Sequence, residues 1–520
     1  MSALLHPVPG GLRLTRRPSL DGGIKTLPTP RQVVLPLNQH AGRPALPVVS
    51  VGDSVTRGQC VGKADGVISV SVHASVAGTV TAIESRPVPG CEAGPSPCVI
   101  IDAAGQQDQQ RPEPLDHDYH LDEPSRLRQV VSDAGIAGLG GAVFPTAVKL
   151  AAEVDMRLQT LIINGAECDP AISCDDALMR EYASEIVAGA RCMLHILQVN
   201  RCIIATKSDN AAAGQAMKQA VTACDDERVT WRQVPGIYPQ GGERQLIQRL
   251  SGLEVPSDGL PLDIGFLCHN VATARAVYRA VEFGEPLTDR VVAVRGKAVT
   301  HPQHVLVPLG TPIADVIAFC GGYAGTPTRL VMGGEMMGIA LSSDELPVVK
   351  ACNALLVMDA SETPSSPAPD PCIRCGDCAT VCPASLQPQQ LHWHSAARDL
   401  DQLVARHLFD CIECGCCDLV CPSHIPLTEQ FRAAKRDVHH RDAAHVTAQH
   451  ARRRFEQRNA RLERLKAQRD ARRAARTAKP PPSVTPKQEN APGPSRKDEI
   501  RAAVERAKAR RAQRENDREV

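Results

Sequence analysis

The chain has 520 residues, enough for three or four domains that each bury a hydrophobic core. Hydrophobic residues make up 43% and aromatic residues only 3%, so the cores must rely on Val, Ile, Leu and Ala. No stretch approaches the roughly 18 uncharged apolar residues of a membrane-spanning helix, which excludes a chain that crosses a bilayer by itself. Twenty cysteines without a signal peptide predict a reducing cytoplasm, where thiolates bind metal rather than pair.

The N-terminal part predicts an extended arm followed by a small barrel. Residues 1 to about 40 are rich in Pro, Gly and basic residues, and residues 47–101 carry short Val-rich runs punctuated by glycines. The runs V-G-D-x-V-x-x-G-Q and V-x-A-x-V-x-G-x-V resemble the lipoyl/biotinyl barrel-sandwich family. Lys63 precedes the expected hairpin tip at residues 64–66. We therefore expect a structural docking barrel rather than a covalent carrier.

From Asp122 to about Glu285, helical patterns alternate with short buried strands. The expected helices and strands, in chain order, are residues 127–137, 160–164, 176–199, 202–206 and 210–223. The alternation predicts a mainly parallel α/β domain.

Three polar or glycine-rich segments lie between these elements. In residues 138–149 (GLGGAVFPTAVK), closely spaced glycines leave main-chain N–H groups open to an anionic or planar ligand. The segment is not a Rossmann fingerprint, because no strand precedes it and its glycine spacing differs. Residues 162–170 follow a strand, where α/β folds place ligand contacts, and the third segment joins residues 238–244 with 268–273. An ordinary loop is the alternative for each.

In this order, G-x-G-G-A-x-F-P-T-x-x-K, N-x-x-E-x-[DE]-P, G-E before a helix and N-V-x-T resemble the flavoprotein subunit of respiratory complex I. That family binds FMN and NADH and passes electrons to iron–sulfur clusters. The resemblance implies these contacts of FMN: Gly138, Gly140, Gly141, Lys149, Asn164, Glu167, Gly242, Glu243, Asn270 and Thr273. It implies Phe144 and Asp169 as contacts of NADH, and it makes Glu243 and Asp169 the candidate catalytic residues.

The sequence departs from that family at five positions. Val143 replaces a loop Gly, Leu139 an Arg, Ala166 an Asp, Asp169 a Glu and Arg244 a second Glu. These departures weaken the implied assignment of the nicotinamide pocket more than that of the loop that would hold the FMN phosphate.

Short strand patterns return between residues 291 and 341, with a helical pattern over residues 313–319. This segment resembles the ubiquitin-like β-grasp domain (SLBB-like) that follows the flavin domain in the same flavoprotein of complex I. A Pro/Ser-rich linker, residues 361–371, then leads to a cysteine-rich segment.

Eight cysteines form two runs with the same C-x2-C-x2-C-x3-C-P spacing. The runs are Cys372, Cys375, Cys378 and Cys382, followed by Cys411, Cys414, Cys417 and Cys421. Bacterial ferredoxins hold two [4Fe–4S] clusters with this spacing, and the fourth Cys of each run ligates the other cluster. The predicted sets are therefore Cys372, Cys375, Cys378 and Cys421 for one cluster, and Cys411, Cys414, Cys417 and Cys382 for the other.

Two zinc sites are the alternative for these cysteines. However, zinc binding does not require the same C-x2-C-x2-C-x3-C-P spacing to occur twice. Cys416 is adjacent to Cys417 in the sequence, and only Cys417 fits the C-x2-C-x2-C-x3-C-P spacing, so we predict Cys417 as the ligand. The other cysteines are scattered singly and are expected to be small buried hydrophobes.

The order of barrel, flavin domain, β-grasp domain and two-cluster module resembles the RnfC (RsxC) family of the Rnf/Rsx electron-transport complex over about residues 1–430. The resemblance implies a peripheral subunit on the cytoplasmic face of the bacterial inner membrane. Such a protein exchanges electrons between NAD(H) and ferredoxin through FMN and two [4Fe–4S] clusters. Its partners are other subunits of the complex, especially an iron–sulfur subunit, with ferredoxin reached indirectly and ions translocated elsewhere.

Two other functions remain open from the sequence. One is a soluble NADH dehydrogenase (diaphorase) subunit of a hydrogenase-type complex, and the other is an iron–sulfur relay without flavin.

The net charge of +1 conceals a basic tail. Residues 431–520 carry 26 Lys and Arg against 12 Asp and Glu. We expect a solvated helix with disordered linkers, which could also adhere to an anionic membrane surface or to acidic partner subunits. Nucleic acid is a poor candidate, because the basic residues come without aromatic stacking platforms.

The predicted fold is thus multidomain α/β with a helical cluster module and a basic tail. The predicted segments are an arm and barrel-sandwich domain (1–120), an FMN/NADH α/β domain (121–288), a β-grasp domain (289–345), a ferredoxin-type domain (362–430) and the tail (431–520).

Overall fold

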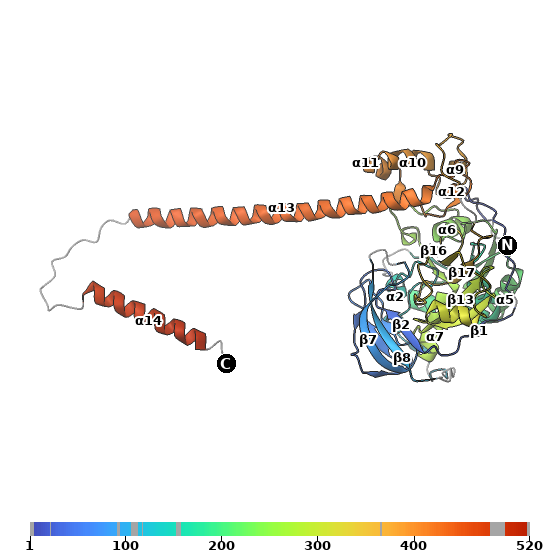
Figure 1. Cartoon of the computed structure of the whole chain (residues 1–520), viewed down its shortest axis with the longest axis horizontal. Coiled ribbons are helices and arrows are strands. Elements are labelled where there is room, and N and C mark those ends of the chain that lie inside the picture. The colour runs from blue at the N-terminus through green and yellow to red at the C-terminus, as the bar shows by residue number, and fades with distance from the viewer. Residues whose placement is uncertain are drawn as a thin grey trace. The chain divides into compact units, whose positions relative to one another are not determined.

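The computed structural model describes residues 5–20, 22–90, 94–105, 113–116, 118–151, 158–363, 367–478 and 495–516 (Figure 1). The chain forms two compact units, Met1–His440 and Arg441–Val520. Every helix in the described ranges is too short or too polar to serve as a membrane span.

The barrel-sandwich domain consists of two small antiparallel sheets, whose blue strands lie together in Figure 1. Their strands, in sheet order, are β2 (Gln32–Pro36), β8 (Ser96–Ala103), β7 (Gly78–Arg86) and β4 (Ser54–Val55), then β3 (Leu46–Pro47), β5 (Cys60–Lys63) and β6 (Val72–His73). The predicted extended arm is wrong over Gln32–Pro36, because Val33 and Leu35 alternate into the barrel core and β2 pairs with β8. Lys63 ends β5 and is exposed.

The α/β domain has a four-stranded parallel sheet, as the alternating pattern predicts. Its strands, in sheet order, are β11 (Val229–Val234), β10 (Cys202–Lys207), β9 (Thr160–Gly165) and β12 (Phe266–Asn270). Its helices are α1 (Pro124–Asp133), α2 (Thr146–Lys149), α3 (Cys174–Glu181), α4 (Ala183–Leu197), α5 (Ala211–Ala223), α6 (Glu243–Ser251) and α7 (Val271–Phe283), with 3-10 turns η1 (Tyr119–Leu121) and η2 (Pro261–Ile264).

Two helix predictions in this domain need correction. The helix expected over residues 176–199 is two helices, α3 and α4, which meet at Tyr182 in a non-helical conformation (φ −125°, ψ 31°). The helix expected over residues 127–137 ends at Asp133, because Gly135 has a left-handed conformation (φ 67°).

The β-grasp domain is built on a mixed six-stranded sheet that recruits a strand from the N-terminal arm. In sheet order the strands are β1 (Lys25–Thr26), β14 (Gln303–Pro308), β13 (Asp289–Arg295), β17 (Ala354–Met358), β15 (Arg329–Met332) and β16 (Ile339–Ala340). The helix α8 (Ile313–Phe319) has the predicted bounds.

The cluster domain repeats one backbone motif after 39 residues. Helix α9 (Asp377–Thr380) corresponds to α12 (Cys416–Leu419), and α10 (Pro388–Ala396) corresponds to the start of α13 (Leu427–Thr477). The helix α11 (Leu400–Ala405) and the turn η3 (Leu408–Asp410) connect the two copies. The first turns of α13 bury Phe431 and Ala434 against this domain.

The second unit contains the rest of α13 and α14 (Arg496–Asn516). From Arg441 to Thr477 the helix is exposed on all sides, as expected for a solvated basic tail. The proline breaks predicted in the tail, at residues 480–482, Pro492 and Pro494, lie outside the described residues.

Candidate functional site

Two of the predicted FMN contacts lie side by side at the carboxyl edge of the parallel sheet. Asn270 ends β12 and is the register partner of Asn164 on β9. The Asn164 side-chain amide donates to the main-chain oxygen of Gly241 (2.8 Å), and the Asn270 amide donates to the Asp175 carboxylate (2.5 Å). The sheet therefore brings together residues from the second and third sequence segments.

The glycine-rich loop, residues 138–144, packs against the same edge. Thr273 Oγ1 accepts the main-chain N–H of Leu139 (2.9 Å), which ties the loop to α7. Gly141 has a φ of 109°, and a Cβ there would meet no atom within 4 Å, so this part of the main chain faces open space. Val143 also has a positive φ (42°), a conformation that the Gly of the related family adopts without strain.

Lys149 and Glu243 form an ion pair beside this loop. Lys149 Nζ lies 2.7 Å from the Glu243 carboxylate and donates to the Cys268 main-chain oxygen at 2.6 Å. Glu243 is the first residue of α6, and Gly242 is the residue before that helix. Both side chains keep access to solvent, so a ligand can reach the pair.

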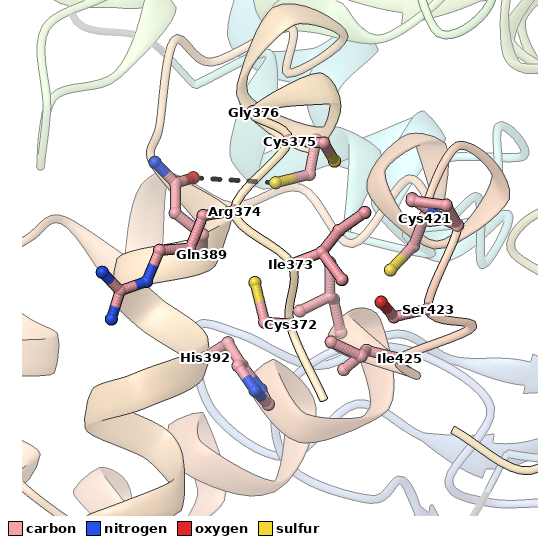
Figure 2. Close-up of a pocket in the computed structure, with 13 residues that line it drawn as sticks. Cys372, Ile373, Arg374, Cys375, Gly376, Gln389, His392, Cys421, Ser423 and Ile425 are labelled. Carbon is pink, nitrogen blue, oxygen red and sulfur yellow. Dashed lines mark hydrogen bonds between the residues drawn. The ribbon is translucent and has the colours of Figure 1, made fainter. Parts of the chain in front are cut away.

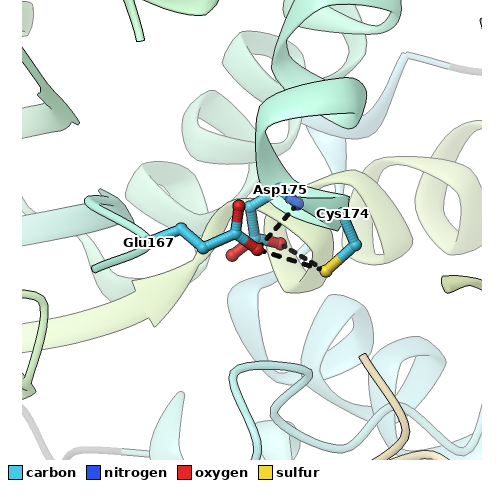
Figure 3. Close-up of side chains that lie close together, drawn as sticks. All are labelled: Glu167, Cys174 and Asp175. Atoms are coloured by element: carbon cyan, nitrogen blue, oxygen red, sulfur yellow. Dashed lines mark hydrogen bonds between the residues drawn. The ribbon is translucent and has the colours of Figure 1, made fainter. Parts of the chain in front are cut away.

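Glu167 is half-buried and lies in a cluster with the buried residues Cys174 and Asp175 (Figure 3). The Glu167 carboxylate accepts the main-chain N–H groups of Asp175 (3.2 Å) and Asp176 (3.4 Å) at the start of α3. Burial, and then the charge of Asp175, raises the pKa of Glu167. Burial also raises the pKa of Asp175, against the lowering effect of the hydrogen bond from Asn270. Both carboxyl groups therefore hold a proton to a higher pH than an exposed acid does.

Asp169 is buried and lies between domains. Its carboxylate accepts the main-chain N–H groups of Ala171 (2.9 Å), Glu335 (3.2 Å) and Met336 (3.1 Å). The last two belong to the loop after β15, so Asp169 joins the α/β domain to the β-grasp domain. Its contact with NADH stays a prediction, and so does that of Phe144, which is 36% exposed on the glycine-rich loop.

Two cations from the β-grasp domain hold the backbone around the glycine-rich loop. Arg290 donates to the main-chain oxygens of Lys350 and Leu139, the latter at 3.3 Å. Lys350 is fully buried and its Nζ donates to the oxygens of Gly135 (2.7 Å) and Ser71 (3.1 Å), with no carboxylate among these contacts. Burial lowers the pKa of Lys350 to about 7.

The cysteines separate into two pockets with the memberships that the spacing predicts. The first is lined by Cys372, Cys375, Cys378 and Cys421 together with Ile373, Ile425 and Leu427. Figure 2 shows Cys421 on the opposite side of this pocket from the loop that carries Cys372 and Cys375. Cys375 is exposed, whereas Cys372 and Cys421 are half-buried.

The second pocket is lined by Cys382, Cys411, Cys414 and Cys417. Two main-chain N–H groups point at its sulfurs, that of Glu413 at Cys411 and that of Leu386 at Cys382, each at 3.4 Å. Cys416 also lines this pocket and is fully buried, so its assignment as a non-ligand stays a prediction.

The loops that carry the cysteines have matching conformations. Arg374 and Glu413 both have positive φ angles (61° and 58°), as do Gly376 and Gly415 (87° and 75°). The left-handed residues curl each loop so that three thiols face one pocket.

The distances between the cysteine sulfurs can be compared with those expected around a single zinc ion. Within the described residues, no three of these sulfurs lie within 4.8 Å of one another. Sulfurs bound to one tetrahedral zinc would be about 3.8 Å apart, given Zn–S bonds of ~2.3 Å.

The residues at the sheet edge also fit a flavin mononucleotide. The glycine-rich loop offers uncovered main chain, and Thr146 Oγ1 beside it is buried without a hydrogen-bond partner. Lys149 adds positive charge next to these donors. Such a set suits a phosphate and a planar ring system.

Tyr238 connects the two kinds of site. It precedes the Gly241–Glu243 segment of the flavin site, is 3% exposed, and donates from its hydroxyl to the main-chain oxygen of Cys414 (2.7 Å). Sequence reasoning missed this contact, the role of Asp175 and that of Lys350. A single buried Lys or Tyr does not produce a periodic pattern in the sequence, so its position in the fold could not be predicted. In the sequence, Asp175 resembles any acidic residue at the start of a helix.

Four family models match the chain in the order of these domains. They are the RnfC barrel sandwich hybrid domain (residues 7–106), the Nuo51 FMN-binding domain (131–279), the SLBB domain (291–340) and the 4Fe-4S dicluster domain (368–425). Fold and sites define an electron-transport flavoprotein subunit with an iron–sulfur dicluster module.

The chain belongs to the RnfC family of ion-translocating oxidoreductase complexes. It is 43% identical to the RnfC-type protein of Pseudomonas aeruginosa (98% of this chain, 66% of the relative), and 39% identical to that of Vibrio cholerae El Tor (98% and 64%). It is 41% identical to that of Salmonella arizonae (94% and 70%). The chain thus spans 64–70% of the length of these relatives.

Among solved structures, an NAD+-reducing [NiFe]-hydrogenase in the air-oxidized state is similar to this chain with a TM-score of 0.42 and 21% identity. The similarity covers 54% of each chain.

Proposed function

We propose that this protein exchanges electrons between NAD(H) and ferredoxin through FMN and two [4Fe–4S] clusters, while partner subunits link the transfer to ion translocation. The observation that carries the proposal is the hydrogen bond from Tyr238 to Cys414, which joins the loop before Gly241–Glu243 to a residue of the second cysteine pocket. A flavin, when bound, accepts two electrons together and releases them singly, which a nicotinamide and one-electron clusters require between them.

The chain's own residues would bind and orient these groups. The glycine-rich loop and Lys149 would hold the phosphate, and Asn164 and Asn270 would bond the ring edge. Glu243 would contact the reacting end of the flavin, and its pairing with Lys149 keeps it in place. Asp169 would act as a positioning residue by fixing the loop at Glu335 and Met336.

The two cysteine pockets would serve opposite ends of the path. The second pocket touches the flavin domain through Tyr238 and Cys414, so we assign it as the entry for electrons from the flavin. In the first pocket Cys375 is exposed and the adjacent Ile373 is 68% exposed. An exposed apolar side chain beside a redox site suits the docking of a partner iron–sulfur subunit.

We place the protein at the cytoplasmic face of the inner membrane, and we assign the basic tail to an anionic surface. Each Lys or Arg near such a surface contributes about 1 kcal/mol. Flotation with vesicles containing anionic phosphatidylglycerol should recover the full chain at low salt but not with neutral vesicles. Equal recovery with both lipids would contradict the assignment.

The test of the proposed function is an anaerobic assay of the purified chain for iron, sulfide and FMN, with spectra before and after NADH. We expect about eight irons, about eight sulfides and one FMN, with bleaching by NADH. Iron without flavin, and no response to NADH, would leave a cluster relay and overturn the proposal.

A further inference from the structure

Residues 10–12 of the N-terminal arm, which we call the strap, cross between the flavin domain and the cluster domain. The Gly11 N–H donates to the oxygen of Val381 (2.9 Å), next to the cluster-pocket residue Cys382. The Leu12 N–H donates to the Tyr238 oxygen (2.7 Å), and the Leu12 oxygen accepts the Tyr238 N–H (2.9 Å). The strap therefore pairs with the same Tyr238 whose hydroxyl binds Cys414.

The strap fits its position without free space. Gly10 has a φ of 59°, and a Cβ there would lie 2.5 Å from the main-chain carbon and oxygen of Cys382. Gly11 has a φ of 86°, and its Cβ would lie 2.7 Å from the Tyr238 oxygen. Leu12 packs against the buried group of Tyr238, Cys414 and Cys416. A side chain at position 10 or 11 therefore forces the strap, or the main chain that it contacts, to shift.

The arm is fixed on both sides of the strap. His6 exchanges hydrogen bonds with Arg249, which donates from its Nη1 to the His6 oxygen (2.6 Å) and accepts the His6 N–H (3.0 Å). Beyond the strap, Arg17 forms ion pairs with Glu335 and Glu362. Both ends of the strap are therefore tied to residues that precede the cysteine runs of the cluster domain.

We infer that the strap is a positioning element that fixes the separation between the flavin site and the second cysteine pocket. The inference rests on the proposed function, because it assigns the strap to the step between flavin and cluster. It predicts that loosening the strap slows this step while both sites keep their cofactors.

The test compares Gly10→Ala and Gly11→Ala with Gly22→Ala in the holoprotein. Gly22 lies in the same arm with a φ of 85°, but its Cβ would meet no atom within 4 Å. All three variants carry the backbone strain of an alanine at positive φ, of roughly 1–2 kcal/mol, and only the first two disturb the strap.

Two readouts are needed. The first is hydrogen exchange at the amides of Gly11, Leu12 and Tyr238, which we expect to become about fivefold faster or more in the strap variants when a hydrogen bond of ~1 kcal/mol is lost. The second is the rate of cluster bleaching after NADH, which should fall below that of Gly22→Ala because electron transfer slows as the donor and the acceptor move apart. Iron and FMN contents should match those of Gly22→Ala.

Unchanged exchange and unchanged bleaching in both strap variants would overturn the inference. Loss of iron or FMN from both would also overturn it, because the strap would then build the sites rather than align them. If the unmodified protein does not respond to NADH, the proposed function fails, while the exchange experiment still tests the strap without nicotinamide.

Discussion

The hydroxyl of Tyr238 donates a 2.7 Å hydrogen bond to the main-chain oxygen of Cys414, so a flavin-domain side chain supports a cysteine loop more than 170 residues further along the chain. We expect Tyr238→Phe to keep iron and FMN but to lower the free energy of unfolding by about 1–3 kcal/mol, because the buried carbonyl loses its donor. Thermal or denaturant unfolding measures the loss. The control is Tyr323→Phe, whose tyrosine is 40% exposed. Its hydroxyl donates to the Asp344 carboxylate (2.6 Å) in an exposed position, so water can replace the lost hydrogen bond and the variant should cost little. Equal losses in the two variants would contradict the prediction.

Because the eight cysteines divide between two pockets, replacing one ligand cysteine should remove the iron of its own pocket only. Cys375→Ala should remove about four irons and halt electron flow through the first pocket, with flavin still bound. Cys416→Ala should retain about eight irons, because the ligand rhythm assigns Cys417 instead. Iron analysis and absorbance spectra separate these outcomes. Loss of FMN from the Cys375 variant would show that the flavin and cluster domains depend on each other.

The ion pair of Glu243 with Lys149 predicts an effect confined to the flavin. Glu243→Ala should slow flavin reduction by NADH about ten- to a hundredfold, the equivalent of losing a charged contact of ~1.5–3 kcal/mol. About eight irons should remain. The exposed residue Glu254 in the same domain provides the matched control, Glu254→Ala. Undiminished reduction by NADH in the Glu243 variant would remove that residue from the site.

The buried Lys350 predicts a pH dependence of stability. Its pKa is about 7 in the folded protein, against an ordinary value of 10.5. Between these values an unfolded Lys350 binds more protons than the folded one, so its contribution to the free energy of unfolding should rise as the pH increases from 7 towards 10.

Lys350→Met should lose this rise and, at high pH, about 1–3 kcal/mol of stability, because the oxygens of Ser71 and Gly135 lose their donor. Urea unfolding at several pH values measures both effects. Lys63→Met replaces an exposed lysine of the neighbouring barrel and should leave the slope unchanged. The same slope in the Lys350 variant as in the unmodified protein would argue against the assignment.

The sequence by itself determined the architecture and the grouping of the cysteines. The C-x2-C-x2-C-x3-C-P rhythm assigned Cys421 to the first set and Cys382 to the second, and both lie in those pockets. Local spacing was sufficient because each short loop brings its own three thiols together. The βαβ alternation likewise fixed a parallel sheet, whose carboxyl edge collects Asn164 and Asn270.

Only the tertiary structure decided how the domains are joined. Leu12, Tyr238 and Cys414 are distant in the chain and have no shared pattern, so their contacts exist only after the domains have packed. The strand at Gln32–Pro36 escaped prediction because its partner, β8, follows about sixty residues later. Such pairings depend on long-range burial and main-chain hydrogen bonds, which a local reading of side-chain periodicity does not contain.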